Sequence, residues 1–318
     1  MLKQDKFTGR ITLDGIDRRM IDANDPAHEA GIHKIEGYTR ALAAAQLMGD
    51  HREEGMQLVN IAFANLFHLE QPNSAIEYYD QALGIFREIH DQSMEAKTLG
   101  YLGMVYLVLQ KPKRAVEYKQ QAIAIYSAIG ERDGEIDQLT SLGMIYGNGG
   151  FSEKAILYFK QALDLAREIP SRQKEAVALT NMGVTYAEMR QEKPAFERLK
   201  QAREIFHEIG NPKEELDTLQ SIGTLYVLRG QAERGIQVYE EALAISRAIA
   251  DRETEADLLQ SLGRACQRQN EYAQAIQYYK AAVEIYDSLR SSVSAGNTRA
   301  RLEACQKLAH KKWWEFWL

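Results

Sequence analysis

Apolar and small residues recur along this chain at a fixed interval of 40 residues. The first recurring position is a glycine that follows an apolar residue. Two further positions, held by alanine or glycine, recur at the same interval. The three columns are Gly103, Gly143, Gly183, Gly223 and Gly263, then Ala115, Ala155, Ala195, Gly235 and Ala275, and finally Ala122, Ala162, Ala202, Ala242 and Ala282. Self-similarity at a fixed period of this length predicts a stack of structural repeats.

Each 40-residue unit has the apolar spacing of two helices. In the unit that begins near residue 91, Leu99, Leu102 and Tyr106 lie on one helical face. Pro112 interrupts that pattern, and a second helical stripe follows it and ends at Gly130. Two helices approach to about 8–10 Å where the side chains at their crossing are small. We therefore expect the glycine and alanine columns to mark helix crossings.

A column of glutamates stands near the expected start of each first helix: Glu95, Glu135, Glu175, Glu215 and Glu255. Carboxylates in a first helical turn interact favourably with the partial positive charge of the helix N-terminus, by about 0.3–1 kcal/mol each. We interpret the column as this stabilising interaction rather than as an acidic row that binds a ligand.

The register predicts six helix pairs between residues 51 and 290, at about 51–90, 91–130, 131–170, 171–210, 211–250 and 251–290. The first pair fits only if the turn before Pro72 holds one extra residue. We expect a capping helix at 25–50, because Asp25 suits the position before a helix and Pro26 its first turn. A second capping helix is expected at 291–310, since repeat arrays need capped ends. Residues 1–24 are expected to form an extended or disordered arm, and residues 311–318 an aromatic tail.

The pattern resembles the tetratricopeptide repeat family. The resemblance rests on Leu-Gly-x-x-Tyr, as in Leu102 to Tyr106, and on the two alanine columns. Leucine replaces the family's usual tryptophan, and its closing proline is absent: Ser127, Arg167, His207 and Arg247 stand there. Without that stop the helices can run longer, which accounts for 40 residues in place of the family's typical 34. This long form is similar to the arrays of kinesin light chains and spindle-orientation adaptors. The resemblance implies an all-α fold, a right-handed α-solenoid of helix hairpins with terminal capping helices.

The bulk composition narrows the class of protein further. The chain has 318 residues and a net charge of −6, which argues against nucleic-acid binding because that needs a basic surface. Two cysteines, Cys266 and Cys305, are too few for a disulfide-built secreted domain. No run of about 18 apolar residues that could span a membrane occurs. We expect a cytoplasmic protein.

No pattern in the sequence predicts an enzyme. The seven histidines are scattered, and none forms a pair at the i, i+4 spacing of a metal site. The glycine cluster from Gly147 to Gly150 lacks the following lysine and serine or threonine of a phosphate-binding loop, and it falls where each unit turns. We expect no catalytic residue, no cofactor and no metal.

The family resemblance places the first helix of each pair on a concave groove that binds partner proteins or peptides. The groove residues expected in this sequence are Phe63, Phe67, Lys97, Met104, Leu107, Val108, Met144, Asn148, Thr180, Val184, Gln220, Val227, Gln260, Arg264 and Arg268. The set is apolar at its N-terminal end and basic at its C-terminal end. It therefore suits an amphipathic or extended peptide with an acidic end, which arginine can bind through two hydrogen bonds. Alternatively, Phe63 and Phe67 pack under the N-terminal capping helix.

The final residues of the sequence are aromatic and basic: Lys311, Lys312, Trp313, Trp314, Phe316 and Trp317. Three interpretations stay open. The segment lies at a membrane interface, where tryptophan and lysine are favoured; it docks on a partner, with tryptophans as the main contacts; or it folds back on the capping helix.

Taken together, these features predict a non-catalytic scaffold or adaptor that binds a partner peptide or segment in the concave groove. A peptide-responsive regulatory sensor and a membrane-associated assembly factor for a membrane protein complex are the alternatives. Binding of acidic chaperone tails is disfavoured, because Lys97, Asn148 and Arg264 fall in distant repeats.

Overall fold

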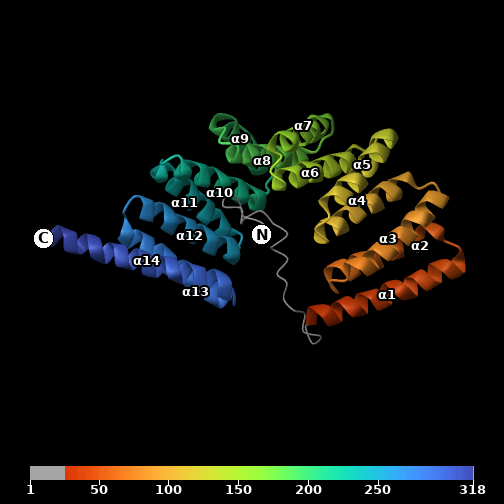
Figure 1. Ribbon diagram of the computed structural model, residues 1–318, viewed down its shortest axis with the longest axis horizontal. Helices are drawn as coiled ribbons and strands as arrows, with labels where there is room; N and C mark the ends of the chain where they lie inside the picture. Colours follow the sequence, from red (N-terminus) through yellow and green to blue (C-terminus); the bar gives the residue numbers. More distant parts are fainter. Residues whose placement is uncertain (1–25, 318) are drawn as a thin grey trace. The chain divides into compact units, whose positions relative to one another are not determined.

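The structure of the chain, a computed structural model, describes residues 26–317. Over this range the chain is all-helical, which confirms the predicted fold class, and its helices follow one another without strands (Figure 1). The helices are α1 Pro26–Met48, α2 His51–Phe67, α3 Pro72–Glu88, α4 Gln92–Val108, α5 Pro112–Ile129, α6 Arg132–Asn148, α7 Ser152–Glu168, α8 Arg172–Glu188, α9 Glu192–Glu208, α10 Pro212–Leu228, α11 Ala232–Ala248, α12 Arg252–Arg268, α13 Tyr272–Ser288 and α14 Ser292–Trp317.

The 40-residue period comes from long helices and short links. Helices α4 and α6 have 17 residues each, and α5 between them has 18. The link between α4 and α5 is residues 109–111, whereas the link between α2 and α3 is residues 68–71 and is one residue longer. The extra residue that the alignment of the first repeat required is therefore present in the structure.

Most links turn through one residue with a positive φ. Glycine holds this position at 130, 150, 210 and 230, and other residue types hold it at His90, Gln110, Arg190, Ala250, Asn270 and Arg290. A left-handed residue after a helix lets the chain hydrogen-bond the last carbonyls, and Lys111 N–H donates to the carbonyl of Tyr106 over 2.8 Å. Pro170 stands at this position after α7, and proline cannot adopt a positive φ. Ile169 is extended there, with φ −112° and ψ 156°.

The chain divides into two compact units shortly after this irregular link. The N-terminal unit is residues 26–174 of the described range, with helices α1–α7 and the first three residues of α8. The C-terminal unit is residues 175–317, with the rest of α8 and helices α9–α14. Within the N-terminal unit each helix packs on the next along the chain, from α1 on α2 to α6 on α7.

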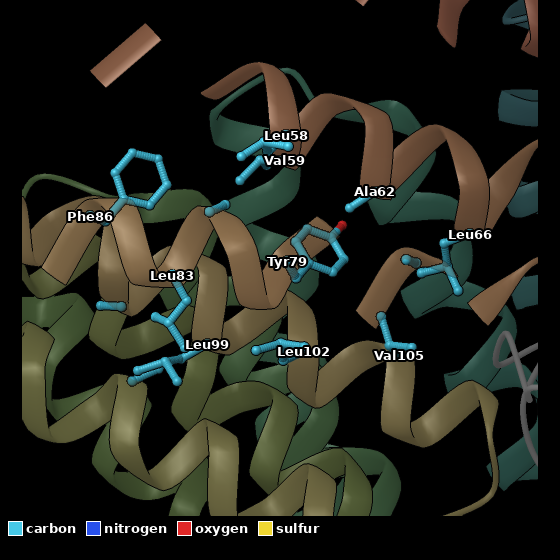
Figure 2. Close-up of a cluster of buried hydrophobic side chains, with 14 of the residues drawn as sticks. Leu58, Val59, Ala62, Leu66, Tyr79, Leu83, Phe86, Leu99, Leu102 and Val105 are labelled. Atoms are coloured by element: carbon cyan, nitrogen blue, oxygen red, sulfur yellow. The ribbon is translucent and has the colours of Figure 1, made fainter. Parts of the chain in front are cut away.

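The core of the N-terminal unit lies between successive helices (Figure 2). Tyr79 and Phe86 of α3 are completely buried, and Leu99 and Leu102 of α4 pack against them in the same cluster. Each such side chain contributes roughly 1.5–3 kcal/mol when it leaves water. The hydroxyl of Tyr79 lies beside Ala62 and has no hydrogen-bond partner among the described residues (Figure 2).

The glycine column lies at helix crossings, as predicted. A methyl group added to Gly143 of α6 would lie 2.4 Å from Cε1 of Phe159 in α7. In the C-terminal unit, Gly223 and Tyr239 have the same relationship, with a closest approach of 2.6 Å. Both alanine columns are fully buried where an alanine stands. Absence of a side chain on the first helix therefore lets a large side chain of the second lie directly on its backbone.

The glutamate column lies in the first turn of the even-numbered helices, as expected, and it also forms ion pairs. Glu255 is only 5% exposed, and the guanidinium of Arg247 at the end of α11 donates to it over 2.9 Å. Arg87 donates to Glu95 over 2.7 Å in the N-terminal unit in the same way. Arg247 occupies the position of the family's closing proline. Loss of that proline therefore lengthens the second helix and supplies a cation for the next one.

Helix α14 is longer than the others, with 26 residues against 17 in α12. Its backbone continues as helix through residues 311–317, where a separate tail was expected. The side chains of Lys311, Lys312, Trp313, Trp314, Phe316 and Trp317, like the expected arm at 1–24, lie outside the described residues. None of the helices over residues 26–317 combines the length and the apolar character needed to cross a membrane.

Candidate partner-binding surface

The predicted contact residues of the N-terminal unit lie on one face, formed by α2, α4 and α6. We call this surface the even-helix face, and it comprises the exposed or half-buried side chains of Phe63, Phe67, Lys97, Met104, Leu107, Val108, Met144 and Asn148. Met104 and Val108 rest on the buried cluster that contains Leu66. Met144 of α6 is exposed and Met104 of α4 is half-buried, so α4 and α6, like α2, each present an accessible apolar group.

Phe63 and Phe67 are the largest apolar groups on this face. Each is 43% exposed, and the centroids of their rings lie 4.4 Å apart. Helix α1 packs on α2 but leaves both rings open to this degree. Because these two rings sit one helical turn apart, they form a single aromatic patch near the C-terminal end of α2.

The predicted contact residues of the C-terminal unit differ in accessibility: Thr180, Val184, Gln220, Val227, Gln260, Arg264 and Arg268. Val184 is 5% and Val227 8% exposed, so both belong to the core. Val227 is buried because its Cγ2 lies over Gly235, 2.4 Å from where a methyl group would stand. Thr180, Gln220 and Gln260 are half-buried.

Arg264 and Arg268 are exposed, and they bond to neutral groups within the C-terminal unit. Arg264 donates to the hydroxyl of Ser261 over 2.9 Å, and Arg268 donates to the carbonyl of Val227 over 3.1 Å. Neither arginine forms an ion pair with a carboxylate among residues 26–317. Both guanidinium groups therefore keep donors that an acidic ligand could use.

The described residues hold no group of three or more histidine, cysteine or acidic side chains placed to bind a metal ion. The two thiols are buried and unpaired. Burial raises the pKa of Cys266 to about 11, and it also raises the pKa of Cys305. Because the thiolate is the reactive form, neither thiol is activated as a nucleophile.

Lys119 of α5 is a buried cation that the sequence analysis did not single out. It is 5% exposed and occupies the column that holds Tyr79, Phe159, Leu199, Tyr239 and Tyr279 in the other repeats. Its Nζ donates to Oε1 of Gln138 in α6 over 3.2 Å. Burial lowers the pKa of Lys119 to about 8, and Asp137 partly opposes this shift. A charged residue in an otherwise apolar column was the signal in the sequence.

These features define an all-helical repeat protein, a solenoid whose repeated faces suit protein–protein interaction. The sequence model of the tetratricopeptide repeat family matches residues 56–128, 137–208 and 214–288, which is more than half of the chain. The chain belongs to the tetratricopeptide repeat family.

Solved structures agree with this assignment. BtubC (BKLC) from P. vanneervenii superposes with a TM-score of 0.64 and 19% identity, over 70% of this chain and 92% of that one. A Rap protein complexed with competence and sporulation factor has a TM-score of 0.55 and 18% sequence identity, over 87% of this chain and 86% of that one. The kinesin light chain-type repeats of Podosopora anserina have a TM-score of 0.54 and 17% sequence identity, over 63% of this chain and 98% of that one. These identities show a shared fold alone. No curated protein sequence matches the chain.

Proposed function

We propose that this chain is a non-catalytic scaffold or adaptor that binds a peptide or segment of a partner protein on the even-helix face. The observation that carries the proposal is the open aromatic pair, Phe63 and Phe67, in line with Met104 and Met144. Contiguous exposed apolar groups on a protein surface mark interaction sites. Methionine adapts to side chains of varied shape, which suits a face that receives a segment of another protein.

The proposed partner segment presents apolar side chains to the aromatic and methionine side chains of the N-terminal unit. The C-terminal unit by itself suits an acidic group, since the guanidinium groups of Arg264 and Arg268 lack carboxylate partners among the described residues and can bind a carboxylate through paired hydrogen bonds. A cytoplasmic location belongs to the same proposal, because free, buried thiols suit a reducing compartment.

The test is selection of peptides from a random display library on the intact chain, followed by affinity measurements on variants. A Met104→Glu, Leu107→Glu double variant places two charges on the even-helix face. We expect selected peptides to bind it at least about tenfold more weakly, a loss of about 1.4 kcal/mol. Phe63→Glu changes a more exposed position and repeats the test if the double variant is poorly folded. Leu157→Glu is the matched control, because Leu157 is 54% exposed on α7 and lies outside this face.

Recovery of no peptide would overturn the proposal. So would peptides that bind the wild-type chain and the two face variants equally well. Loss of binding in Leu157→Glu to the same extent would locate the interaction away from the even-helix face and would also overturn it.

A peptide-responsive sensor is the second candidate, and the Rap structure with its bound factor favours it. In this version the bound segment changes the arrangement of the repeats as well as occupying a face. Small-angle scattering of the chain with and without a selected peptide tests it. An unchanged radius of gyration at saturation would leave the adaptor proposal in place and remove the sensor.

Membrane contact through the end of the chain is a third candidate. The length of α14 favours it, because the helix carries all three tryptophans of the chain in its final turns. Tryptophan and lysine favour the membrane interface. Liposome flotation of the chain beside a Trp313→Ser, Trp314→Ser, Trp317→Ser variant tests it, and equal flotation of both proteins would exclude this role.

A further inference from the structure

Lys119 is a buried charge whose counter-ion is missing among the described residues. Its one hydrogen bond goes to a neutral amide, Gln138, and it forms no ion pair. The carboxylate of Asp137 influences Lys119 electrostatically, but Oδ1 of Asp137 lies 2.8 Å from Nζ of Lys174. A buried charge without a partner costs several kcal/mol in protein stability. A tyrosine, phenylalanine or leucine, which other repeats use, would avoid that cost.

The backbone around Lys119 makes room for this polar group. The lysine stem crosses Gly103 of α4, where a methyl group would lie 2.9 Å from its Cγ. The amide of Gln138 lies against Gly100 of the same helix, where a methyl group would lie 2.9 Å from its Nε2. The ammonium of Lys119 and the amide of Gln138 thus meet between α4 and α6, the two helices that carry Met104 and Met144.

We propose that Lys119 and Gln138 form a carboxylate-binding subsite of the even-helix face, filled by an acidic side chain of the bound segment. This inference rests on the proposed function and names one chemical feature of the partner. Lys119 has three donors and uses one, and the Nε2 of Gln138 has no hydrogen bond among the described residues. A carboxylate accepts from both groups, and it supplies the counter-ion that Lys119 lacks among the described residues.

The surroundings favour a single carboxylate over a phosphate or a polyanion. Asp137 on α6 influences Lys119 electrostatically, and it shares one cation, Lys174, with Asp133 of the same helix. The carboxylates of Asp133 and Asp137 would repel a doubly charged anion, and the one buried ammonium of Lys119 would have to offset that repulsion. An acidic side chain brings one negative charge and an apolar stem, which suits the apolar side chains of the even-helix face.

The test uses peptides selected on the wild-type chain, each compared with its isosteric amide, with Gln in place of Glu or Asn in place of Asp. We expect one such replacement to weaken binding to the wild-type chain about tenfold, but to change binding to Lys119→Met less than about twofold. Methionine retains the length of the side chain and suits an apolar column. Lys160→Met is the matched control, because Lys160 is an exposed lysine on α7 and its loss changes net charge equally.

The outcomes separate the two proposals. Two outcomes overturn the subsite alone. In the first, peptides depend on the even-helix face, but the amide replacement does not weaken their binding to the wild-type chain. In the second, the amide replacement weakens binding to Lys119→Met as much as it weakens binding to the wild-type chain. If no peptide is recovered, the proposed function fails, and nuclear magnetic resonance of lysine-labelled protein decides the subsite. Propionate should then shift the Lys119 Nζ signal in a saturable way, while propionamide should not. A signal that responds to neither probe overturns the subsite.

Discussion

The aliphatic stem of Lys119 lies against the backbone of Gly103, so closely that a methyl group on the glycine would stand 2.9 Å from the lysine Cγ. The same contact joins Phe159 to Gly143 in the next repeat. Lysine therefore fills the place of an aromatic ring, and it brings a charge into a site built for apolar groups. The free protein bears the energetic cost of that buried charge.

Replacement of Lys119 with methionine should stabilise the free protein. We expect the free energy of unfolding to rise by about 1–3 kcal/mol, because the variant no longer buries a charge without a counter-ion. Urea unfolding of both proteins near neutral pH measures the difference. Gln138→Leu should by contrast destabilise the chain, since it leaves the ammonium with no hydrogen-bond partner among the described residues. A loss of stability in Lys119→Met would contradict this account.

The stability difference between wild type and Lys119→Met should shrink as pH rises. Burial lowers the folded-state pKa of Lys119 from 10.5 to about 8, while Asp137 on α6 offsets part of this effect. Between these two values the unfolded chain binds more protons, so the free energy of unfolding of the wild type rises with pH. Below about pH 8 both states are protonated and the full difference remains. Unfolding curves at about pH 7 and about pH 9.5 test this, and a constant difference would disprove it.

Two tyrosines of the same column should respond oppositely to loss of their hydroxyls. Tyr79 has a buried hydroxyl without a partner among the described residues, whereas the hydroxyl of Tyr279 donates to Gln267 over 3.0 Å. Tyr79→Phe should leave the free energy of unfolding unchanged or raise it by up to about 1 kcal/mol. Tyr279→Phe should lower it by about 0.5–1.5 kcal/mol. Chemical denaturation measures both, and an equal loss in the two variants would show that Tyr79 also has a partner.

Two helical glycines should respond oppositely to alanine. Gly143→Ala sets a methyl group 2.4 Å from the ring of Phe159, so we expect a loss of roughly 1–3 kcal/mol as the core shifts. Gly84→Ala on α3 meets nothing within 4 Å, and the better helix propensity should raise stability by roughly 0.5–1 kcal/mol. Thermal unfolding of the two variants and the wild type measures the sign of each change in stability. A neutral Gly143→Ala would mean that the close contact is not needed at this crossing.

The all-helical fold could be predicted from the sequence because its cause is local and repeated. Gly143 and Ala155 hold small side chains where helices cross, and the helical spacing of leucines around each glycine sets the buried face. The irregular link at Pro170 was not predicted, although proline cannot adopt the positive φ of the other links. The division of the chain shortly after this link could not be predicted either, because it depends on the packing of whole helices.

The candidate surface could be predicted only in part, because exposure depends on neighbours from other repeats. Val227 falls in the predicted contact column, but it is buried in the core because Gly235 has no side chain and leaves room for it. Phe63 and Phe67 could have been covered by the capping helix, and only the placement of α1 leaves them open. Lys119 escaped notice because a surface helix contains many lysines, and only its column shows that this one is buried.

A last prediction concerns the links between helices. Ala250 has a φ of 57° between α11 and α12, where a side chain with a Cβ is strained, while Gly210 holds the same position after α9 with a φ of 65°. Ala250→Gly should raise the free energy of unfolding by roughly 0.5–1 kcal/mol, because relief of the strain outweighs the added freedom of the unfolded chain. Gly210→Ala should lower it by roughly 1 kcal/mol for the converse reason. Urea unfolding of both variants tests the pair. If Ala250→Gly lowered stability, then the link would be held by contacts of the alanine methyl group, and strain at the left-handed residues would not limit the stability of the array.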